Sequence, residues 1–285
     1  MTCRVNGLRA HSKKITSRLN KKKGKLMDLF LKGKTALVTG AARGLGASIC
    51  AQLANEGAFV IAVSRTTSDL KVLIDSLPNS KQHKFFALDL AESTGPAKLI
   101  HMLKESNESP DIIVNNLGGT LGFTNPFGPI DEFKHVMRIN LEVAIELNTA
   151  LMPSMRKKNW GRIVHISSIA AIENQGPPSY CAAKAALNAY VRSVARLVCS
   201  ENIVMTTVMP GAVLTKGGYW ESELVSSPKK VDAYIKERMA IGRLGRPEEI
   251  SRLVSFLCSE HASFCVGSAF LMDGGQGRSF SPNAF

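Results

Sequence analysis

The sequence predicts one doubly wound α/β domain built on a parallel sheet of about seven strands. From Lys34 onward, short apolar runs alternate with helical stretches. Several of these runs are apolar on both faces, which is typical of strands covered by helices on both sides. Strand–helix alternation implies right-handed crossovers and parallel neighbours. We expect strands at Thr35–Thr39, Phe59–Val63, Lys84–Leu88, Ile112–Asn115, Arg162–Ile166, Val204–Met209 and Ala269–Met272, and helices near 44–56, 92–106, 131–155, 180–200 and 247–259.

Residues 1–33 are predicted to be a basic, flexible extension, and residues 34–285 the folded domain. The formal net charge is +13, and residues 1–34 hold eleven Lys and Arg against one acid, Asp28. The remaining chain therefore has little basic excess, which argues against nucleic-acid binding as the main activity. Short cationic segments poor in apolar residues are usually solvated. Contact with an anionic membrane or nucleic acid, an organelle leader and an over-extended translation start are the alternatives.

No apolar run reaches the roughly 18 residues that a membrane-spanning helix requires. The basic start is not followed by the apolar core of a secretory signal. The six cysteines form no C-x-x-C pair and no metal-like spacing, and the six histidines form no metal pattern. We therefore expect a cytoplasmic protein with reduced thiols and no metal site.

A glycine-rich turn, TGAARGLG at 39–46, closes the first strand and opens the first helix. Gly40 permits the tight turn, Gly44 lets backbone amides approach a pyrophosphate, and Gly46 lets helix and strand pack closely. The helix N-terminus adds a partial positive charge. Because the motif lies between a strand and a helix at the front of the domain, it predicts a dinucleotide site on a Rossmann-type sheet.

The end of the second strand predicts NADP(H) in preference to NAD(H). NAD enzymes need an acid near this point to hold the ribose 2′-hydroxyl, but Ser64 and Arg65 stand there. A carboxylate would repel a 2′-phosphate, whereas an arginine pairs with it. Arg43, inside the glycine turn, can supply a second positive charge. The alternative for either arginine is a solvated surface charge.

The G-x-x-x-G-x-G spacing of this turn resembles the short-chain dehydrogenase/reductase family, and the resemblance runs from about Lys34 to Gly275. It implies an oxidoreductase that moves hydride between NADP(H) and a carbonyl or alcohol carbon. It also implies that Asp89 contacts adenine, although Asp89 could instead cap the helix that follows. The cofactor-binding residues implied are Gly40, Arg43, Gly44, Leu45, Gly46, Ser64, Arg65, Asp89, Leu90, Asn116, Gly118, Tyr180, Lys184, Pro210, Gly211, Val213 and Thr215.

Tyr180 and Lys184 are the expected catalytic pair. Their spacing on a helix puts phenol and ammonium on one face, with about 5–6 Å between Cβ atoms. A free phenol has a pKa of about 10, and a nearby ammonium favours the phenolate and lowers that pKa. Tyr180 would then give a proton to a reduced carbonyl or take one from an alcohol. The family resemblance adds that Lys184 holds the nicotinamide ribose hydroxyls.

Three further residues take their roles from the resemblance. It assigns the hydrogen bond to the substrate oxygen to Ser168, with Ser167 as the alternative because the usual distance to the tyrosine is one residue longer when counted from Ser168. It matches Asn140 to an asparagine that bends the long helix and holds a water linking the lysine to solvent. Read alone, Asn140 is a surface or kink residue.

The segment PGAVLT at 210–215 resembles the family's loop that holds the nicotinamide carboxamide, through the Val213 backbone and the Thr215 hydroxyl. The last strand packs at a subunit interface in related proteins, so the resemblance implies a homo-oligomer, a tetramer or a dimer. Tyr219 and Trp220, in the irregular segment Gly217–Lys230, would help to shape the substrate pocket, as would the loop Leu121–Ile130.

The substrate implied is a small-molecule or acyl-thioester carbonyl compound. The pattern most resembles 3-oxoacyl-acyl-carrier-protein reductases and the related sugar, polyol and secondary-alcohol dehydrogenases. Arg156, Lys157 and Lys158 could dock an acidic carrier protein, whereas Glu201 would repel it. Hypotheses of another class are a catalytically idle NADP-binding regulator and a nucleic-acid binder acting through the basic tail. The complete set of catalytic residues argues against the first.

Overall fold

Seven parallel strands form one sheet in the order β3-β2-β1-β4-β5-β6-β7. The computed structural model describes residues 27–173 and 175–278. The strand order reverses between β1 and β4, which is the switch point where open α/β sheets bind ligands. The strands are β1 (Thr35–Thr39), β2 (Phe59–Ser64), β3 (Lys84–Ala87), β4 (Ile112–Asn115), β5 (Gly161–Ile166), β6 (Ile203–Pro210) and β7 (Ala269–Met272).

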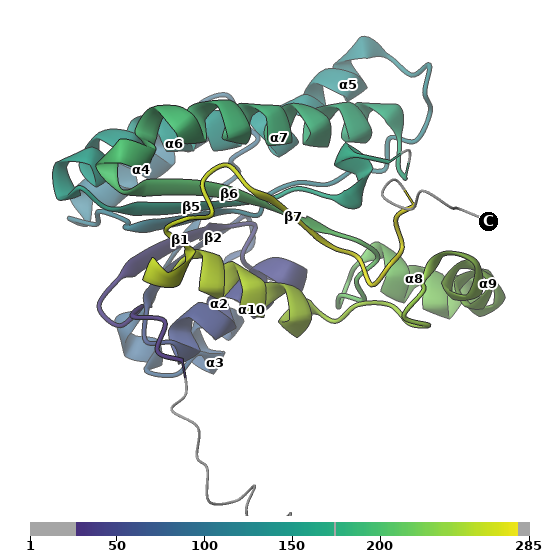
Figure 1. Ribbon diagram of the computed structural model, residues 1–285, viewed down its shortest axis with the longest axis horizontal. Coiled ribbons are helices and arrows are strands. Elements are labelled where there is room, and N and C mark those ends of the chain that lie inside the picture. The colour runs from purple at the N-terminus through teal and green to yellow at the C-terminus, as the bar shows by residue number, and fades with distance from the viewer. Residues whose placement is uncertain (1–26, 174, 279–285) are drawn as a thin grey trace, which may run out of the picture.

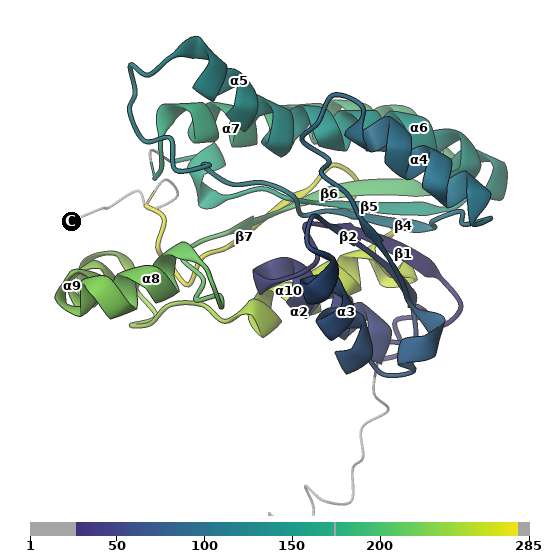
Figure 2. The same ribbon diagram turned by 180° about the vertical axis from the view of Figure 1, so that it is seen from behind.

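Helices cover both faces of this sheet, with α2, α3 and α10 on one side and α4, α6 and α7 on the other (Figure 1). The view from behind shows the same two layers (Figure 2). The helices are α2 (Gly44–Asn55), α3 (Thr67–Ser76), α4 (Gly95–Glu105), α5 (Ile130–Met137), α6 (Val143–Lys158), α7 (Pro178–Val198), α8 (Tyr219–Ser226), α9 (Pro228–Arg238) and α10 (Pro247–Leu257).

Alternating side chains of the central strands form two buried apolar clusters. Leu37, Ile113 and Ile163 pack with the α4, α6 and α7 side, and Val38 and Val164 pack with the α2 and α10 side. All five are fully buried. The strands are therefore apolar on both faces because both faces are covered, as the sequence pattern predicted.

The predicted doubly wound α/β fold with a parallel sheet of about seven strands is confirmed. Three parts of the element prediction differ. The helix α3, between β2 and β3, was not expected. The expected helix 131–155 is interrupted by a π-helical turn at Arg138–Glu142, and the segment expected to be irregular contains α8. The helices α8 and α9 meet at a third small cluster that includes Val231, and Trp220 and Leu224 pack against this cluster.

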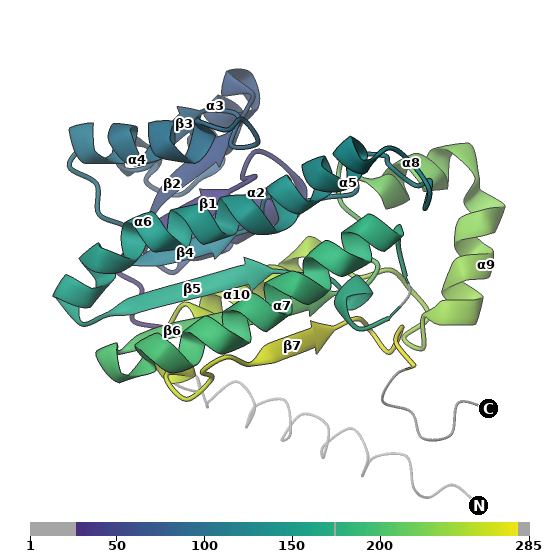
Figure 3. The same ribbon diagram turned by 90° about the horizontal axis from the view of Figure 1, so that it is seen from above.

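The pair α8 and α9 projects from the carboxyl ends of the strands, as the view from above shows (Figure 3). Within the described residues, no helix is long and apolar enough to cross a membrane.

At the start of the chain, most of the predicted extension lies outside the described residues. Its last part does not stand apart from the domain, since Leu29 and Leu31 are buried in the cluster on the α2 side.

Candidate functional site

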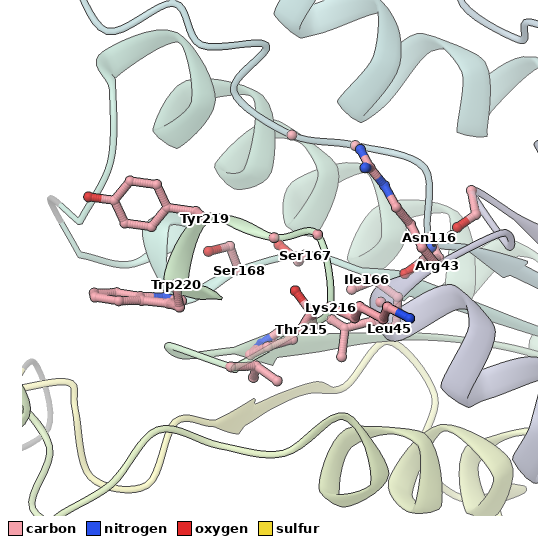
Figure 4. Close-up of a pocket in the computed structure, with 18 of the residues that line it drawn as sticks. Arg43, Leu45, Asn116, Ile166, Ser167, Ser168, Thr215, Lys216, Tyr219 and Trp220 are labelled. Atoms are coloured by element: carbon pink, nitrogen blue, oxygen red, sulfur yellow. Dashed lines mark hydrogen bonds between the residues drawn. The ribbon is translucent and has the colours of Figure 1, made fainter. Parts of the chain in front are cut away.

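A pocket of about 470 Å³ opens at the carboxyl ends of the central strands. Figure 4 shows Tyr219 and Trp220 at one end of it, and Arg43 and Asn116 at the other. The predicted site residues that line it are Gly40, Arg43, Gly44, Leu45, Ser64, Asn116, Gly118, Ser168, Tyr180, Lys184, Pro210, Gly211, Val213 and Thr215.

The glycine turn builds an anion site at the start of α2. Gly44 has φ +57°, a conformation that other residues rarely adopt. A Cβ at Gly46 would overlap the Gly40 carbonyl oxygen, so only glycine allows this approach of helix and strand. Among the described residues, no side chain caps the first amides of α2, and no acid lies in the first turn of this helix. Those amides and the helix dipole are therefore free to receive a phosphate.

Two cations line this part of the pocket, Arg43 and Lys216. Neither side chain makes an ion pair or hydrogen bond with another described residue. The Arg43 guanidinium lies against the loop after β6, since a Cβ built at Gly217 would be 3.4 Å from its Nη1. Unpaired cations in a pocket favour an anionic ligand.

The other predicted arginine is placed differently. Arg65 lies outside the pocket lining, and its Nη1 is 3.8 Å from Asp89 Oδ2 with the Arg65 side chain 73% exposed. Asp89 also accepts a hydrogen bond from the Ala91 amide at 2.8 Å. This is a local turn contact and not a cap of the following helix, because α4 begins at Gly95 with Thr94 as its N-cap. Leu90 is buried in the cluster on the α6 side, away from the pocket surface.

Asn116 and Gly118 connect the glycine turn with Asn140 and Lys184. Asn116 Nδ2 donates to the carbonyls of Thr39 and Gly40, both at 3.0 Å, which braces the ends of β1 and β4. A Cβ at Gly118 would lie 2.5 Å from Asn140 Oδ1 and 3.0 Å from Lys184 Nζ. Glycine is required here because two polar side chains meet against its backbone.

Lys184 is buried on α7, and its Nζ donates to the Ile166 carbonyl at 2.8 Å. It lies 5.6 Å from the centroid of the Tyr180 ring. Burial lowers the pKa of Lys184 to about 7. Its ammonium can therefore lose a proton near neutral pH.

The pKa of Tyr180 differs in direction from the sequence expectation. Burial raises the pKa of the phenol, and a hydrogen bond with Ser168 acts against that rise. Desolvation is the largest cause, because a buried phenolate loses its hydration. In the free protein Tyr180 is therefore a neutral proton donor.

The two candidate serines point to different partners. Ser168 lines the pocket, hydrogen-bonds Tyr180, and accepts a hydrogen bond from the Ala170 amide at 3.1 Å. Ser167 also lines the pocket, but it is buried and its hydroxyl donates to the Lys184 carbonyl at 3.4 Å. The structure thus brings Ser168, rather than Ser167, beside the phenol.

Asn140 lies in the π-helical turn between α5 and α6. Its Oδ1 accepts from the Gly119 amide at 3.0 Å, and its Nδ2 donates to the carbonyls of Gly119 and Val136 at 2.8 Å. These bonds hold the loop after β4 against the helix. A π turn at this point matches the local bend that the sequence resemblance implied, and such turns are frequent at functional sites.

The loop after β6 closes the pocket from the other side. Val213 pairs with Gly245 in an isolated bridge, and the Gln276 side chain accepts from the Ala212 amide at 2.6 Å. Thr215 approaches the glycine turn, with its Cβ 3.5 Å from a Cβ built at Gly44. The strand end and the turn therefore face each other across the pocket.

Sequence reasoning missed the lining residues Ile166, Lys216 and Gly119. Lys216 directly follows the predicted Thr215, so its position in the sequence was the available signal. The proposed carrier-docking residues are placed at the wrong end: Arg156 and Lys158 close α6 just before β5, at the amino edge of the sheet. There they pair with Glu201 at 3.0 Å and Asp111 at 2.7 Å.

Within the part of the chain that is described, no group of three or more His, Cys, Asp or Glu side chains is arranged to hold a metal ion.

Residues 40–276 match the family model described as enoyl-(acyl carrier protein) reductase. The 3-oxoacyl-(acyl-carrier-protein) reductase FabG of Pseudomonas aeruginosa is 33% identical over 249 residues, 87% of this chain and 98% of that protein.

Among solved structures, a 3-oxoacyl (acyl-carrier-protein) reductase of Agrobacterium tumefaciens with NADP bound is 30% identical, with a TM-score of 0.82 over 90% of this chain and 99% of that one. L-sorbose reductase of Gluconobacter frateurii, complexed with NADPH and L-sorbose, is 30% identical, with a TM-score of 0.81 over 88% of this chain and 98% of that one.

Proposed function

The chain belongs to the short-chain dehydrogenase/reductase family, and from this premise we propose that it is an NADP(H)-dependent reductase of 3-oxoacyl thioesters or a similar carbonyl substrate. One observation carries the proposal. Ser168, Tyr180 and Lys184 line the same pocket as the glycine turn of α2. The proton donor Tyr180, the hydrogen-bond donor Ser168 and the phosphate-binding turn of the cofactor site therefore share one cavity.

NADP(H) fits the cradle on several grounds. The first amides of α2 and the unpaired Arg43 and Lys216 suit phosphate groups, and Ser64 at the end of β2 brings no carboxylate that would repel a 2′-phosphate. When bound, the cofactor supplies the hydride that converts the carbonyl carbon into a secondary alcohol. Val213 and Thr215 would hold its carboxamide, and Lys184 its ribose.

The catalytic side chains handle the proton. Ser168 donates a hydrogen bond to the substrate oxygen and stabilises the negative charge that develops there. Tyr180 transfers its phenolic proton to that oxygen as a general acid. The Lys184 ammonium, 5.6 Å from the ring centroid, stabilises the phenolate left behind. Because the pKa of Lys184 is about 7, this group can also pass a proton on at neutral pH.

A sugar, polyol or other small-ketone reductase is the second candidate, supported by the similarity to L-sorbose reductase. The cytoplasmic location and the homo-oligomer, a tetramer or a dimer, stay predictions from the sequence. Light scattering on the purified chain would test the assembly.

The test follows absorbance at 340 nm with NADPH and with NADH, offering acetoacetyl thioester, keto sugars and diketones, beside a Tyr180→Phe control. NADPH oxidation that Tyr180→Phe abolishes supports the proposal. Failure to bind either cofactor would overturn it. A chain lacking residues 1–26 should keep full turnover, whereas a tail-mediated nucleic-acid binder would lose its activity.

A further inference from the structure

The substrate end of the pocket is walled by aromatic side chains. Tyr219 and Trp220 line the cavity beyond Ser168 (Figure 4). Their rings are 5.2 Å apart in an edge-to-face arrangement, and Trp220 packs on Tyr234 at 4.4 Å between centroids. Such contacts fix the aromatic faces in place.

Polar side chains beside this wall are already engaged with one another. Gln276 is buried, and it donates to the Tyr234 hydroxyl at 2.8 Å and to Gln175 Oε1 while accepting from the Ala212 amide. Gln175 in turn donates to Glu173 Oε2 at 2.7 Å. The Tyr219 hydroxyl hydrogen-bonds Lys230. These groups hold α9 and the chain after β7 together.

Among the described side chains that line the pocket beyond the cofactor cradle, Ser168 and Tyr180 serve the substrate's carbonyl oxygen. The indole N–H of Trp220, which makes no hydrogen bond with another described residue, is one further donor. A polyhydroxylated substrate needs several further donors and acceptors, because each of its hydroxyls loses water on binding. An apolar body needs none and gains from the aromatic surface.

Exposed apolar side chains also lie on chain segments next to the pocket lining. Of fourteen large hydrophobic side chains exposed in the described residues, seven lie in two short segments. These are the loop and helix that follow the pocket residue Gly119, and the stretch from Leu214 into α8. In the ribbon views α5 lies above and α8 below the carboxyl ends of the strands (Figures 1 and 2). The seven are Leu121, Phe127, Ile130, Phe133, Leu214, Tyr219 and Val225.

We infer that the substrate carries a hydrocarbon body next to its carbonyl group, a medium or long acyl chain or an apolar ring, and not a polyol. The inference rests on the proposed reductase function and narrows its substrate class. Concentrated exposed apolar surface marks ligand or partner sites, and here it lies on the two chain segments that adjoin the pocket-lining residues Gly119 and Thr215.

The test measures kcat/KM for 3-oxoacyl thioesters of four, eight and twelve carbons, for a bicyclic ketone and for a keto sugar. Burial of each additional methylene should raise kcat/KM about two- to fourfold until the wall is covered. A preference for the bicyclic ketone over the chains would support the same apolar class with a ring as the occupant. A keto sugar as best substrate, with no dependence on chain length, would overturn the inference.

Substitutions in the aromatic wall test whether Tyr219 and Trp220 cause the dependence of kcat/KM on chain length. Tyr219→Ala and Trp220→Ala should flatten the chain-length dependence through KM, and Trp220→Phe should restore most of it. Phe264→Ala is the matched control, since Phe264 is fully exposed and lies before β7, away from the pocket. A flattened dependence in Phe264→Ala would contradict the assignment. NADPH affinity should stay unchanged in all four variants.

Calorimetry on the NADPH-saturated enzyme gives a readout independent of turnover. A saturated dodecanoyl thioester should bind, and Tyr219→Ala should weaken it at least fivefold. Absence of NADPH binding would overturn the proposed function itself. NADPH binding without affinity for the dodecanoyl thioester would overturn the present inference alone.

Discussion

Substitutions of the two neighbouring serines, Ser167 and Ser168, should differ in their effect on kcat but not in their effect on stability. Ser168→Ala removes a hydroxyl that lines the pocket and hydrogen-bonds Tyr180. Loss of one donor to a developing oxyanion typically lowers kcat by about 10²–10³-fold. Ser167→Ala removes a hydroxyl whose partner is the Lys184 backbone carbonyl. It should therefore change kcat less than about threefold, a smaller effect on the activation free energy than one typical hydrogen bond contributes.

Both variants should lose similar stability. Ser167→Ala gives up one long buried hydrogen bond, at 3.4 Å, and Ser168→Ala gives up the acceptor for the Ala170 amide, at 3.1 Å. Each loss is worth about 1 kcal/mol, or about 2–4 °C in Tm for a domain of this size.

The assay pairs steady-state NADPH oxidation with thermal unfolding of the same preparations. A Ser167→Ala variant as inactive as Ser168→Ala, at equal stability, would refute the assignment of the two roles.

Three further outcomes follow from the same geometry. Arg43→Ala should weaken NADPH binding about 10–100-fold in calorimetry, which is the usual contribution of hydrogen bonds to a charged group, and should leave NADH binding unchanged. Arg65→Ala should weaken NADPH binding less, because the Arg65 side chain is exposed beside Asp89. A larger loss in Arg65→Ala than in Arg43→Ala would contradict the position of Arg43 at the pocket. Because the pKa of Lys184 is lowered to about 7, the unfolded chain binds the extra proton between about pH 7 and 10. The free energy of unfolding of the wild type, measured with urea, should therefore rise relative to that of Lys184→Met as pH increases through that window. A difference that does not change with pH would contradict the lowered pKa of the buried lysine. Burial lowers the pKa of His165 to about 4. Wild type should therefore lose stability relative to His165→Gln as pH falls from about 6.5 to 4. Equal pH dependence of the unfolding free energy in both proteins would show that the imidazole is solvated.

The strands and the glycine turn could be predicted because their signals are local. Val38 and Ile113 belong to short runs whose β-branched residues favour strands wherever both faces are covered. The positive φ of Gly44 reflects a conformational requirement that the motif spacing expresses directly.

Placement of individual side chains depends on contacts between distant segments, which local signals do not report. The sequence put Arg65 first and Arg43 second as partners of a 2′-phosphate. In the structure Asp89, just after β3, pairs with Arg65, whereas Arg43 lines the pocket. The π turn at Asn140 depends on hydrogen bonds to Gly119, twenty-one residues earlier. Similarly, α8 is a short helix held by packing against α9, so composition alone did not reveal it.

The most direct test of the central claim follows the hydride itself. Purified enzyme is given a 3-oxoacyl thioester with NADPH carrying deuterium on one or the other face of its nicotinamide C4, and the product is analysed by mass spectrometry. The account predicts that one of the two labelled cofactors, and not the other, raises the product mass by one unit, and that Tyr180→Phe abolishes the product. A product without deuterium from both cofactors, or equal turnover by Tyr180→Phe, would contradict it.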